Sequence, residues 1–160
     1  PLTEAGEGIV ALSANIGAAG GDLDKLHRLM AAIAERVSYT PGATHPGTTA
    51  EAALAQGAGV CQDHAHIFVS AARRIGFPAR YVSGYLMMEG VGEQAASHAW
   101  AEAHVDNLGW VAFDPANCIS PDARYVRLAT GLDYRDAMPV SGILLGQAEE
   151  QLAVRITVEQ

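Results

Sequence analysis

The order of the expected elements predicts an α+β domain, with helices first and antiparallel strands after them. Apolar residues recur at helical spacing over residues 23–37 and again over 61–75. After Pro78, β-branched and aromatic residues dominate, and the short connection Asp106-Asn107-Leu108-Gly109 joins two strand-like segments. Because the helices precede the strands and do not alternate with them, the pattern favours an antiparallel sheet packed against helices.

The size and charge of the chain fit one folded domain over residues 1–160. Hydrophobic residues make up 49% and charged residues 18%, which is the reverse of a disordered composition. The formal net charge of −8 disfavours nucleic acid or an anionic membrane surface as a partner. No apolar run reaches the roughly 18 residues of a membrane span. With no signal peptide visible either, we expect a cytoplasmic protein, although the start at Pro1 suggests a piece of a longer chain.

The N-terminal half predicts three helices separated by loops rich in glycine and proline. The first covers residues 23–37, with Asp22 as its N-cap. A loop at 40–48 follows, and the threonine that opens segment 49–56 can cap a short second helix. The third helix covers residues 61–75 and ends at the following glycine.

The C-terminal half predicts strands. We expect residues 89–97 to form a loop and residues 115–139, which contain three prolines, to be irregular. The composition and alternation of the remaining segments predict strands over residues 80–87, 98–105, 110–114, 140–145 and 152–158.

Cys61 is the first candidate for chemistry because it stands at the expected start of the third helix. A helix N-terminus offers free backbone N–H groups and the positive end of the helix dipole, and both stabilise a thiolate. The preceding sequence Gly57-Ala58-Gly59-Val60 would let a substrate backbone approach closely. The structural alternative is a small buried core cysteine.

A thiolate nucleophile needs a base and a group that orients the base, and the expected hairpin offers both. If its turn centres near Asp106, His98 lies opposite Asp114, with about 5 Å between their Cβ atoms on one face. A centre shifted by half a residue would separate the two side chains. The alternatives are a sheet histidine and an aspartate that opens an Asp-Pro turn.

Two sequence blocks resemble the core of bacterial transglutaminase-like proteins. The first is GVCQDHAH at residues 59–66, followed by GFPARYVSGY at residues 76–85. The second comprises SHAWAE at residues 97–102 and GWVAFDP at residues 109–115, which are similar to the His and Asp segments of that family. The resemblance extends over roughly residues 20–158 and implies a papain-like fold.

The resemblance also implies a catalytic triad of Cys61, His98 and Asp114. Active members attack a carboxamide or peptide carbonyl with the thiolate and form a thioester, without a cofactor. The family includes cross-linking acyltransferases, peptidases, amidases and inactive members, so a peptide or protein substrate is expected and a binding or scaffold domain is the alternative. Bacterial members often carry a β-rich domain upstream, which would fit an excised chain.

Several further residues are candidates with weaker support. Gln56 could donate to the oxyanion together with the Cys61 backbone N–H. Tyr85 and Trp100 are expected to wall the cleft or pack in the core. Two acids have competing roles, since Asp63 could favour the helix dipole, and Glu102 could bond within the cleft or pair with Arg80.

A metal site is the chemical competitor. Cys61 and His64 stand at a spacing that places both on one face of a helix. The sequence does not show the three or four converging ligands that zinc needs, so no metal is expected.

Overall fold

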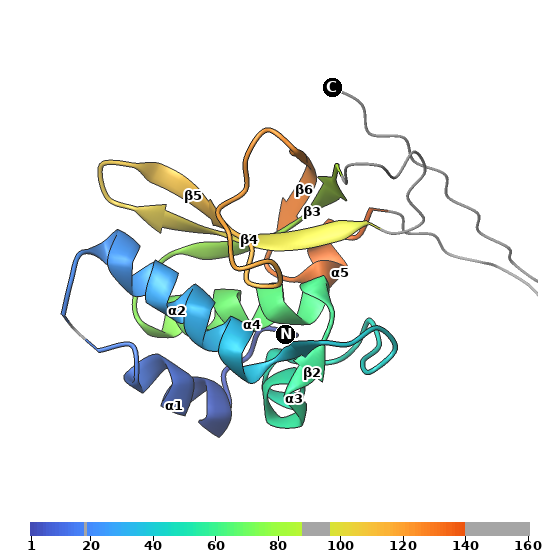
Figure 1. The fold of residues 1–160 in the computed structure, drawn as a ribbon, viewed down its shortest axis with the longest axis horizontal. Helices are drawn as coiled ribbons and strands as arrows, with labels where there is room; N and C mark the ends of the chain where they lie inside the picture. Colours follow the sequence, from blue (N-terminus) through green and yellow to red (C-terminus); the bar gives the residue numbers. More distant parts are fainter. Residues whose placement is uncertain (18, 88–96, 140–160) are drawn as a thin grey trace, which may run out of the picture.

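The larger sheet of the protein packs against a helical layer (Figure 1). The computed structural model describes residues 1–17, 19–87 and 97–139. Its helices and strands confirm the predicted α+β class; in chain order they are α1 Glu7–Ala14, α2 Asp22–Arg36, β1 Ser38–Tyr39, α3 Ala50–Gln56, β2 Ala58–Gly59, α4 Cys61–Arg74, β3 Ala79–Leu86, β4 His98–Val105, β5 Gly109–Phe113, β6 Tyr125–Gly131 and α5 Tyr134–Ala137.

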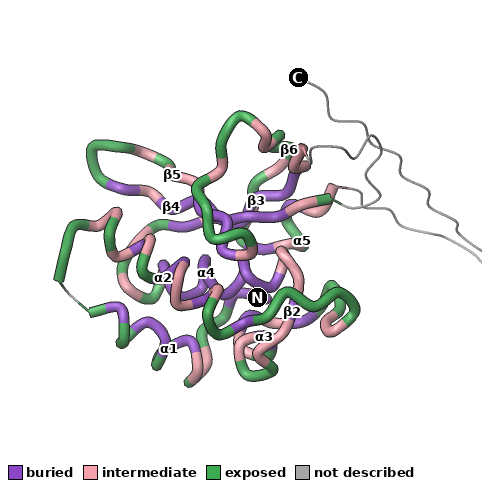
Figure 2. Tube along the Cα trace, viewed as in Figure 1, coloured by how far each residue is buried: buried purple, intermediate pink, exposed green. Residues whose placement is uncertain are grey.

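Helix α4 is the centre of the structure. All of its residues from Asp63 to Ala72 are buried, because α1, α2 and α3 pack against it on one side and β3 and β4 on the other (Figure 2). Inward-facing alanines of β4 let the helix approach the sheet closely, and the ring of Phe68 stacks on Phe113 at 5.0 Å. This packing fixes the position of the first turn of α4, where Cys61 lies.

The larger sheet has the strand order β5-β4-β3-β6 within the described residues, and its pairings are antiparallel. Arg80 pairs with Glu102 across β3 and β4, and Gly84 pairs with His98 at the start of β4. In the pairing of β3 with the edge strand β6, the register shifts between Ser83 and Gly84. The predicted strands at 80–87, 98–105 and 110–114 therefore correspond to β3, β4 and β5.

Local signals located the starts of α3 and α4. The Thr49 hydroxyl accepts a hydrogen bond from the Ala52 N–H at 3.2 Å, as expected of an N-cap. The Asp63 carboxylate accepts from the Val60 N–H at 2.8 Å and so closes the start of α4. At α2 the prediction was wrong by one residue: Gly21 is the N-cap, and Asp22 is already helical and bonds Lys25 at 2.9 Å.

Helix α1 was missed by the sequence analysis. Its glycine-containing start has low intrinsic helix propensity. Its first N–H groups are satisfied from a distant segment, because Glu51 of α3 accepts from Gly8 at 2.7 Å and from Ile9 at 3.0 Å. A cap that comes from another helix leaves no local pattern in the sequence.

The prediction that residues 115–139 are irregular was also wrong. They contain β6 and α5, because their prolines flank these elements and do not interrupt them. The predicted strands at 140–145 and 152–158, and nearly all of the predicted loop at 89–97, lie outside the described residues.

A side chain at Gly84 is expected to destabilise the sheet strongly. A Cβ there would lie 2.0 Å from the Val126 carbonyl oxygen and 2.8 Å from the Trp100 ring. We expect Gly84→Ala to lower the free energy of unfolding by about 3 kcal/mol, measured by urea denaturation. Gly21→Ala is the control: a Cβ there meets nothing within 4 Å, and the loss of a glycine N-cap should cost only about 1 kcal/mol or less. Equal stability of the two variants would contradict the close packing over Gly84.

Candidate active site

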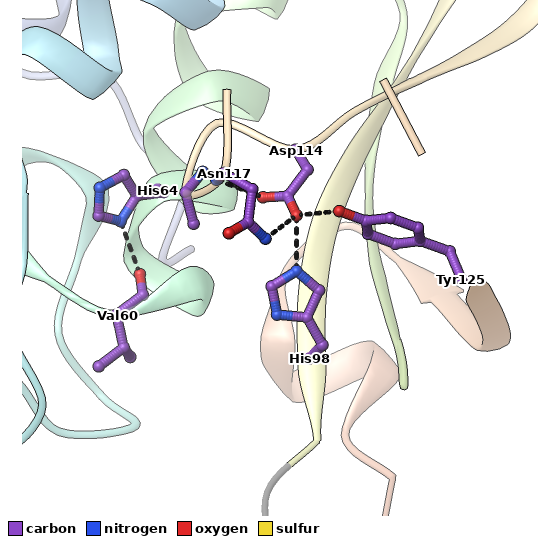
Figure 3. Close-up of polar contacts among 7 residues, drawn as sticks. Val60, His64, His98, Asp114, Asn117 and Tyr125 are labelled. Atoms are coloured by element: carbon purple, nitrogen blue, oxygen red, sulfur yellow. Dashed lines mark hydrogen bonds and ion pairs between the residues drawn. The ribbon is translucent and has the colours of Figure 1, made fainter. Parts of the chain in front are cut away.

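The imidazole of His98 is paired with the carboxylate of Asp114. Nε2 of His98 lies 2.7 Å from Oδ2 of Asp114, and the Asp114 side chain is fully buried (Figure 3). His98 begins β4, whereas Asp114 directly follows β5. The structure therefore brings together two of the three residues of the expected triad.

The predicted hairpin register was wrong, although the two side chains meet. Val105 pairs with Gly109 and Ala101 with Phe113, so the turn centres on residue 107 and not on Asp106. Asp114 leaves the ladder and forms an isolated bridge with Ile119. The turn centre lies one whole residue later than predicted, so each side chain of the hairpin stays on the face of the sheet that was expected for it. His98 and Asp114 are therefore diagonal neighbours, at a distance that long side chains can span.

Asp114 is held by partners that the sequence analysis did not identify. Besides His98, its Oδ2 accepts from Asn117 Nδ2 and from the Tyr125 hydroxyl, each at 2.7 Å (Figure 3). Its Oδ1 accepts the backbone N–H groups of Ala116 and Asn117. The Asp-Pro-Ala-Asn turn could have indicated the backbone contacts. No local signal links Tyr125 to Asp114, because Tyr125 comes from β6.

The charges of the site are coupled through His98. Burial of the imidazole acts to lower its pKa, but hydrogen bonds to Asp114 and to the Cys61 side chain outweigh it and raise the pKa to about 9. Burial also opposes ionisation of Asp114, yet its hydrogen bonds, led by that to His98, hold its pKa below the usual value. Since Nε2 faces Asp114, Nδ1 is the ring nitrogen left for Cys61.

Cys61 occupies the place that the sequence predicts for it. It is the first residue of α4 and is half-buried. The N–H groups of the first helical residues have no acceptor within the helix. The side chain of Cys61 contributes to the raised pKa of His98, so the start of α4 lies near the His98–Asp114 pair of β4 and the residue after β5.

Aromatic rings surround the paired His98. Trp100 is buried and stacks on His98 with ring centroids 6.3 Å apart, while Tyr125 packs against both rings. These rings restrict the imidazole and limit its access to water. Tyr85, the other predicted wall residue, is half-buried on β3 opposite Val126. Its role stays a prediction.

Residues near the start of α4 anchor the loop at 40–48. Gln56 donates to the Ala43 carbonyl at 3.0 Å, Gln62 donates to the Pro46 carbonyl at 3.2 Å, and Thr44 donates to Asp63 at 2.6 Å. The amide of Gln56 is thus engaged with the loop, and its predicted part in an oxyanion hole stays a prediction.

The two acids of the motif blocks have structural partners. Asp63 is buried and caps α4, in line with its expected place at the helix N-terminus. Glu102 pairs with Arg80 at 2.6 Å and with Arg127 at 3.0 Å, which decides between the two roles considered for it.

The Cys61–His64 pair does not extend into a metal centre in the part of the chain that the structure describes. Nδ1 of His64 lies 2.8 Å from the Val60 carbonyl oxygen, and Nε2 lies 2.9 Å from that of Val37. The described residues include no group of three or more His, Cys, Asp or Glu side chains that could hold a metal ion. Among the same residues, no helix is both long and apolar enough to cross a membrane.

Comparison with known proteins identifies the family. The family model of the transglutaminase-like superfamily matches residues 10–115, which include Cys61, His98 and Asp114. The chain belongs to the transglutaminase-like superfamily. This result confirms the resemblance seen in the sequence.

Relatives and solved structures agree with this membership of the transglutaminase-like superfamily. An uncharacterized protein of Mycobacterium leprae is 36% identical over 128 residues, which cover 77% of this chain and 45% of the relative. Uncharacterized proteins of Mycobacterium tuberculosis are 32% identical over 143 residues, with 81% of this chain and 45% of theirs covered. The chain thus spans about half the length of the curated relatives it matches.

Two crystal structures share the fold. A "Putative Cysteine Protease" from Cytophaga hutchinsonii superposes with a TM-score of 0.72 at 29% identity, covering 81% of this chain and 43% of that one. A structure named as a TGase gives a TM-score of 0.57 at 18% identity and covers 72% and 32% of the two chains. The second comparison shows the fold alone.

The Tyr125 hydroxyl is expected to moderate the basicity of Asp114. In Tyr125→Phe, Oδ2 loses one donor, so the carboxylate should hold the His98 proton more strongly. We expect the pKa of His98, followed by NMR, to rise further by up to about one unit. Tyr134→Phe, in α5, is the control. An unchanged or lower pKa of His98 would contradict this role.

Proposed function

We propose that the domain catalyses cysteine-dependent acyl chemistry on amide or peptide carbonyl groups. The observation that carries the proposal is the pairing of His98 Nε2 with Asp114 at 2.7 Å, together with the place of Cys61 at the start of α4, from where it helps to raise the pKa of His98. A nucleophile, a base and an orienting acid in hydrogen-bonded sequence are the parts that covalent catalysis needs.

The reaction follows from these parts. The Cys61 thiolate attacks the carbonyl carbon, and the carbonyl oxygen takes up the displaced electron pair as an oxyanion. The electron pair returns, the C–N bond breaks, and the His98 imidazolium donates its proton to the leaving amine. The thioester is then attacked by water or by a second amine, which passes its proton to the neutral imidazole. The tetrahedral intermediate collapses, the C–S bond breaks, and Cys61 leaves as the thiolate while the product is released. Asp114 keeps Nδ1 directed at Cys61 throughout.

Hydrolysis and transfer share the first half of this reaction. The name of the Cytophaga hutchinsonii structure, at 29% identity, supports a hydrolase. A scaffold domain without activity is the alternative from another class. It is disfavoured because the chain retains Cys61, His98 and Asp114 together, with His98 paired to Asp114, and an inactive domain has no reason to keep all three.

Trapping the thioester tests the proposal. The protein is incubated with a p-nitrophenyl ester and, separately, with glutamine-containing peptides, and intact mass is measured after an acid quench. We expect an acyl adduct on Cys61 that hydroxylamine removes. A fluorescent primary amine added afterwards separates transfer from hydrolysis. Absence of any adduct on Cys61, or equal labelling of Cys118, would refute the proposal.

The rate of acylation is expected to fall as the pH rises through about 9. Because the pKa of His98 is raised to about 9, the imidazolium is present below that pH and is lost above it. The neutral ring can no longer stabilise the thiolate or protonate the leaving amine. The measurement is kcat/KM from pH 7 to 10.5, with circular dichroism to exclude unfolding. A rate that rises steadily to pH 10.5 would contradict the assignment.

A further inference from the structure

The thioester reaction of the proposed function requires donors for the oxyanion. The Cys61 N–H is one candidate, because the first N–H groups of a helix have no acceptor inside it. A second donor is usual in such sites, and loss of one donor typically slows the reaction by about 10² to 10³. Gln56 was predicted from the sequence, but its amide already bonds the Ala43 carbonyl at 3.0 Å. Another donor close to Cys61 would meet the need better.

Tyr39 lies next to the segment that leads into Cys61. Its strand, β1, pairs in parallel with β2, and Tyr39 is opposite Gly59, two residues before the cysteine. Backbone hydrogen bonds fix this register, since the Ser38 N–H donates to Gly57 at 2.9 Å and the Thr40 N–H donates to Gly59 at 2.8 Å. The short parallel pair, which no sequence pattern indicated, thereby holds Tyr39 at the start of α4.

The side chain of Tyr39 is accessible to solvent, and its ring lies near the ring of His64. It is 56% exposed, which leaves its surface open to a substrate. Its ring lies 6.3 Å from the ring of His64, in the first turns of α4. His64 cannot swing away freely, because both of its nitrogens contact backbone carbonyl oxygens. Among the described residues, the Tyr39 hydroxyl makes no hydrogen bond that would occupy it.

The pKa of Tyr39 is affected by the charges of the candidate triad. Burial raises the pKa of Tyr39 first, and the negative charges of Cys61 and Asp114 raise it further. The hydroxyl therefore lies within electrostatic reach of both residues. It also keeps its proton at neutral pH, which a hydrogen-bond donor must do.

We propose that the Tyr39 hydroxyl is the second oxyanion donor, acting with the Cys61 backbone N–H on the carbonyl oxygen of the substrate. This inference rests on the proposed acyl chemistry. It makes Tyr39 a catalytic residue, because its hydroxyl would touch the reacting oxygen. The contact strengthens as charge develops on that oxygen, so it lowers the barrier to acylation more than it aids substrate binding.

Two reactions of the same thiol distinguish this role from others. Acylation of Cys61 passes through an oxyanion, whereas alkylation by iodoacetamide displaces iodide and forms no oxyanion. In Tyr39→Phe we expect kcat for acylation to fall about 10²-fold or more, with KM changed less than about threefold. The rate of alkylation should stay within about twofold of wild type. A peptide aldehyde, which forms a tetrahedral adduct with the thiol, should bind correspondingly more weakly. Tyr134→Phe controls for loss of a tyrosine hydroxyl elsewhere.

The other possible outcomes show whether the proposed function or only the role of Tyr39 is wrong. If wild type never forms an acyl-enzyme, the proposed function fails. If wild type is acylated and Tyr39→Phe is acylated equally fast, only the role of Tyr39 is refuted. Parallel loss of acylation and alkylation would also refute it, because Tyr39 would then act on the thiol and not on the oxyanion. If acylation slows in Gln56→Ala but not in Tyr39→Phe, the second oxyanion donor is Gln56, as predicted from the sequence, and not Tyr39.

Discussion

Cys61→Ser is expected to abolish acyl-enzyme formation, with a loss of roughly 10⁴ to 10⁶ in rate. The serine hydroxyl keeps the size of the side chain but stays protonated at neutral pH, so the helix N-terminus and His98 no longer hold a strong nucleophile. The loss is measured as the rate of p-nitrophenol release from an activated ester, together with the intact mass of the protein.

Cys118→Ser is the matched control, because Cys118 is an exposed free thiol in the same protein. It should react at the wild-type rate. Both variants should unfold at wild-type urea concentrations, since Cys61 lies at the edge of the core and the substitution creates no cavity. Substantial residual acylation in Cys61→Ser would place the nucleophile elsewhere.

Asp114→Asn is expected to lower acylation by about 10³ to 10⁴ while the substrate still binds. The amide NH₂ cannot accept from His98, Asn117 and Tyr125, which all donate to the same carboxylate oxygen in the native site. The imidazole loses its fixed orientation, and its pKa should fall from about 9 towards the ordinary value of histidine. Single-turnover kinetics and NMR titration of His98 measure the two effects.

The same change is expected to lower the free energy of unfolding by about 1 to 3 kcal/mol, because donors that faced a buried carboxylate are left unpaired. Asp122→Asn is the control for a carboxylate in the same loop region, since Asp122 is exposed and bonds Arg124. It should change neither quantity markedly. A fully active Asp114→Asn variant would show that the carboxylate does not orient the base.

The sequence located the residues of the candidate triad because their signals are local. Cys61 follows a glycine-containing break and begins a helix with apolar periodicity, so its place at a helix N-terminus could be predicted. His98 begins β4, and Asp114 directly follows β5. Even with the turn centre wrong by one residue, the two stayed on one face because the strand period is two.

What the sequence could not predict depends on contacts between distant segments. Tyr125 reaches Asp114 only because β6 folds back beside β3, and this pairing includes a register shift. Tyr39 is placed by a two-residue parallel pair too short to show any periodicity. The amide of Gln56 is engaged by a loop thirteen residues away along the chain. In each case tertiary structure, and not local propensity, decides the partner.

The pH dependence of thiol alkylation tests the central claim most directly, namely that Cys61 and His98 form a thiolate–imidazolium pair. Wild-type protein is treated with iodoacetamide between pH 5 and 10, and the labelling of Cys61 and Cys118 is followed in the same sample by peptide mass spectrometry. Cys118 is an exposed free thiol with no place in the candidate triad, so it serves as the internal reference. We predict that Cys61 is alkylated at pH 6 at least about tenfold faster than Cys118 and that His98→Gln removes this difference. Equal rates for the two thiols at pH 6 in the wild-type protein would contradict the account.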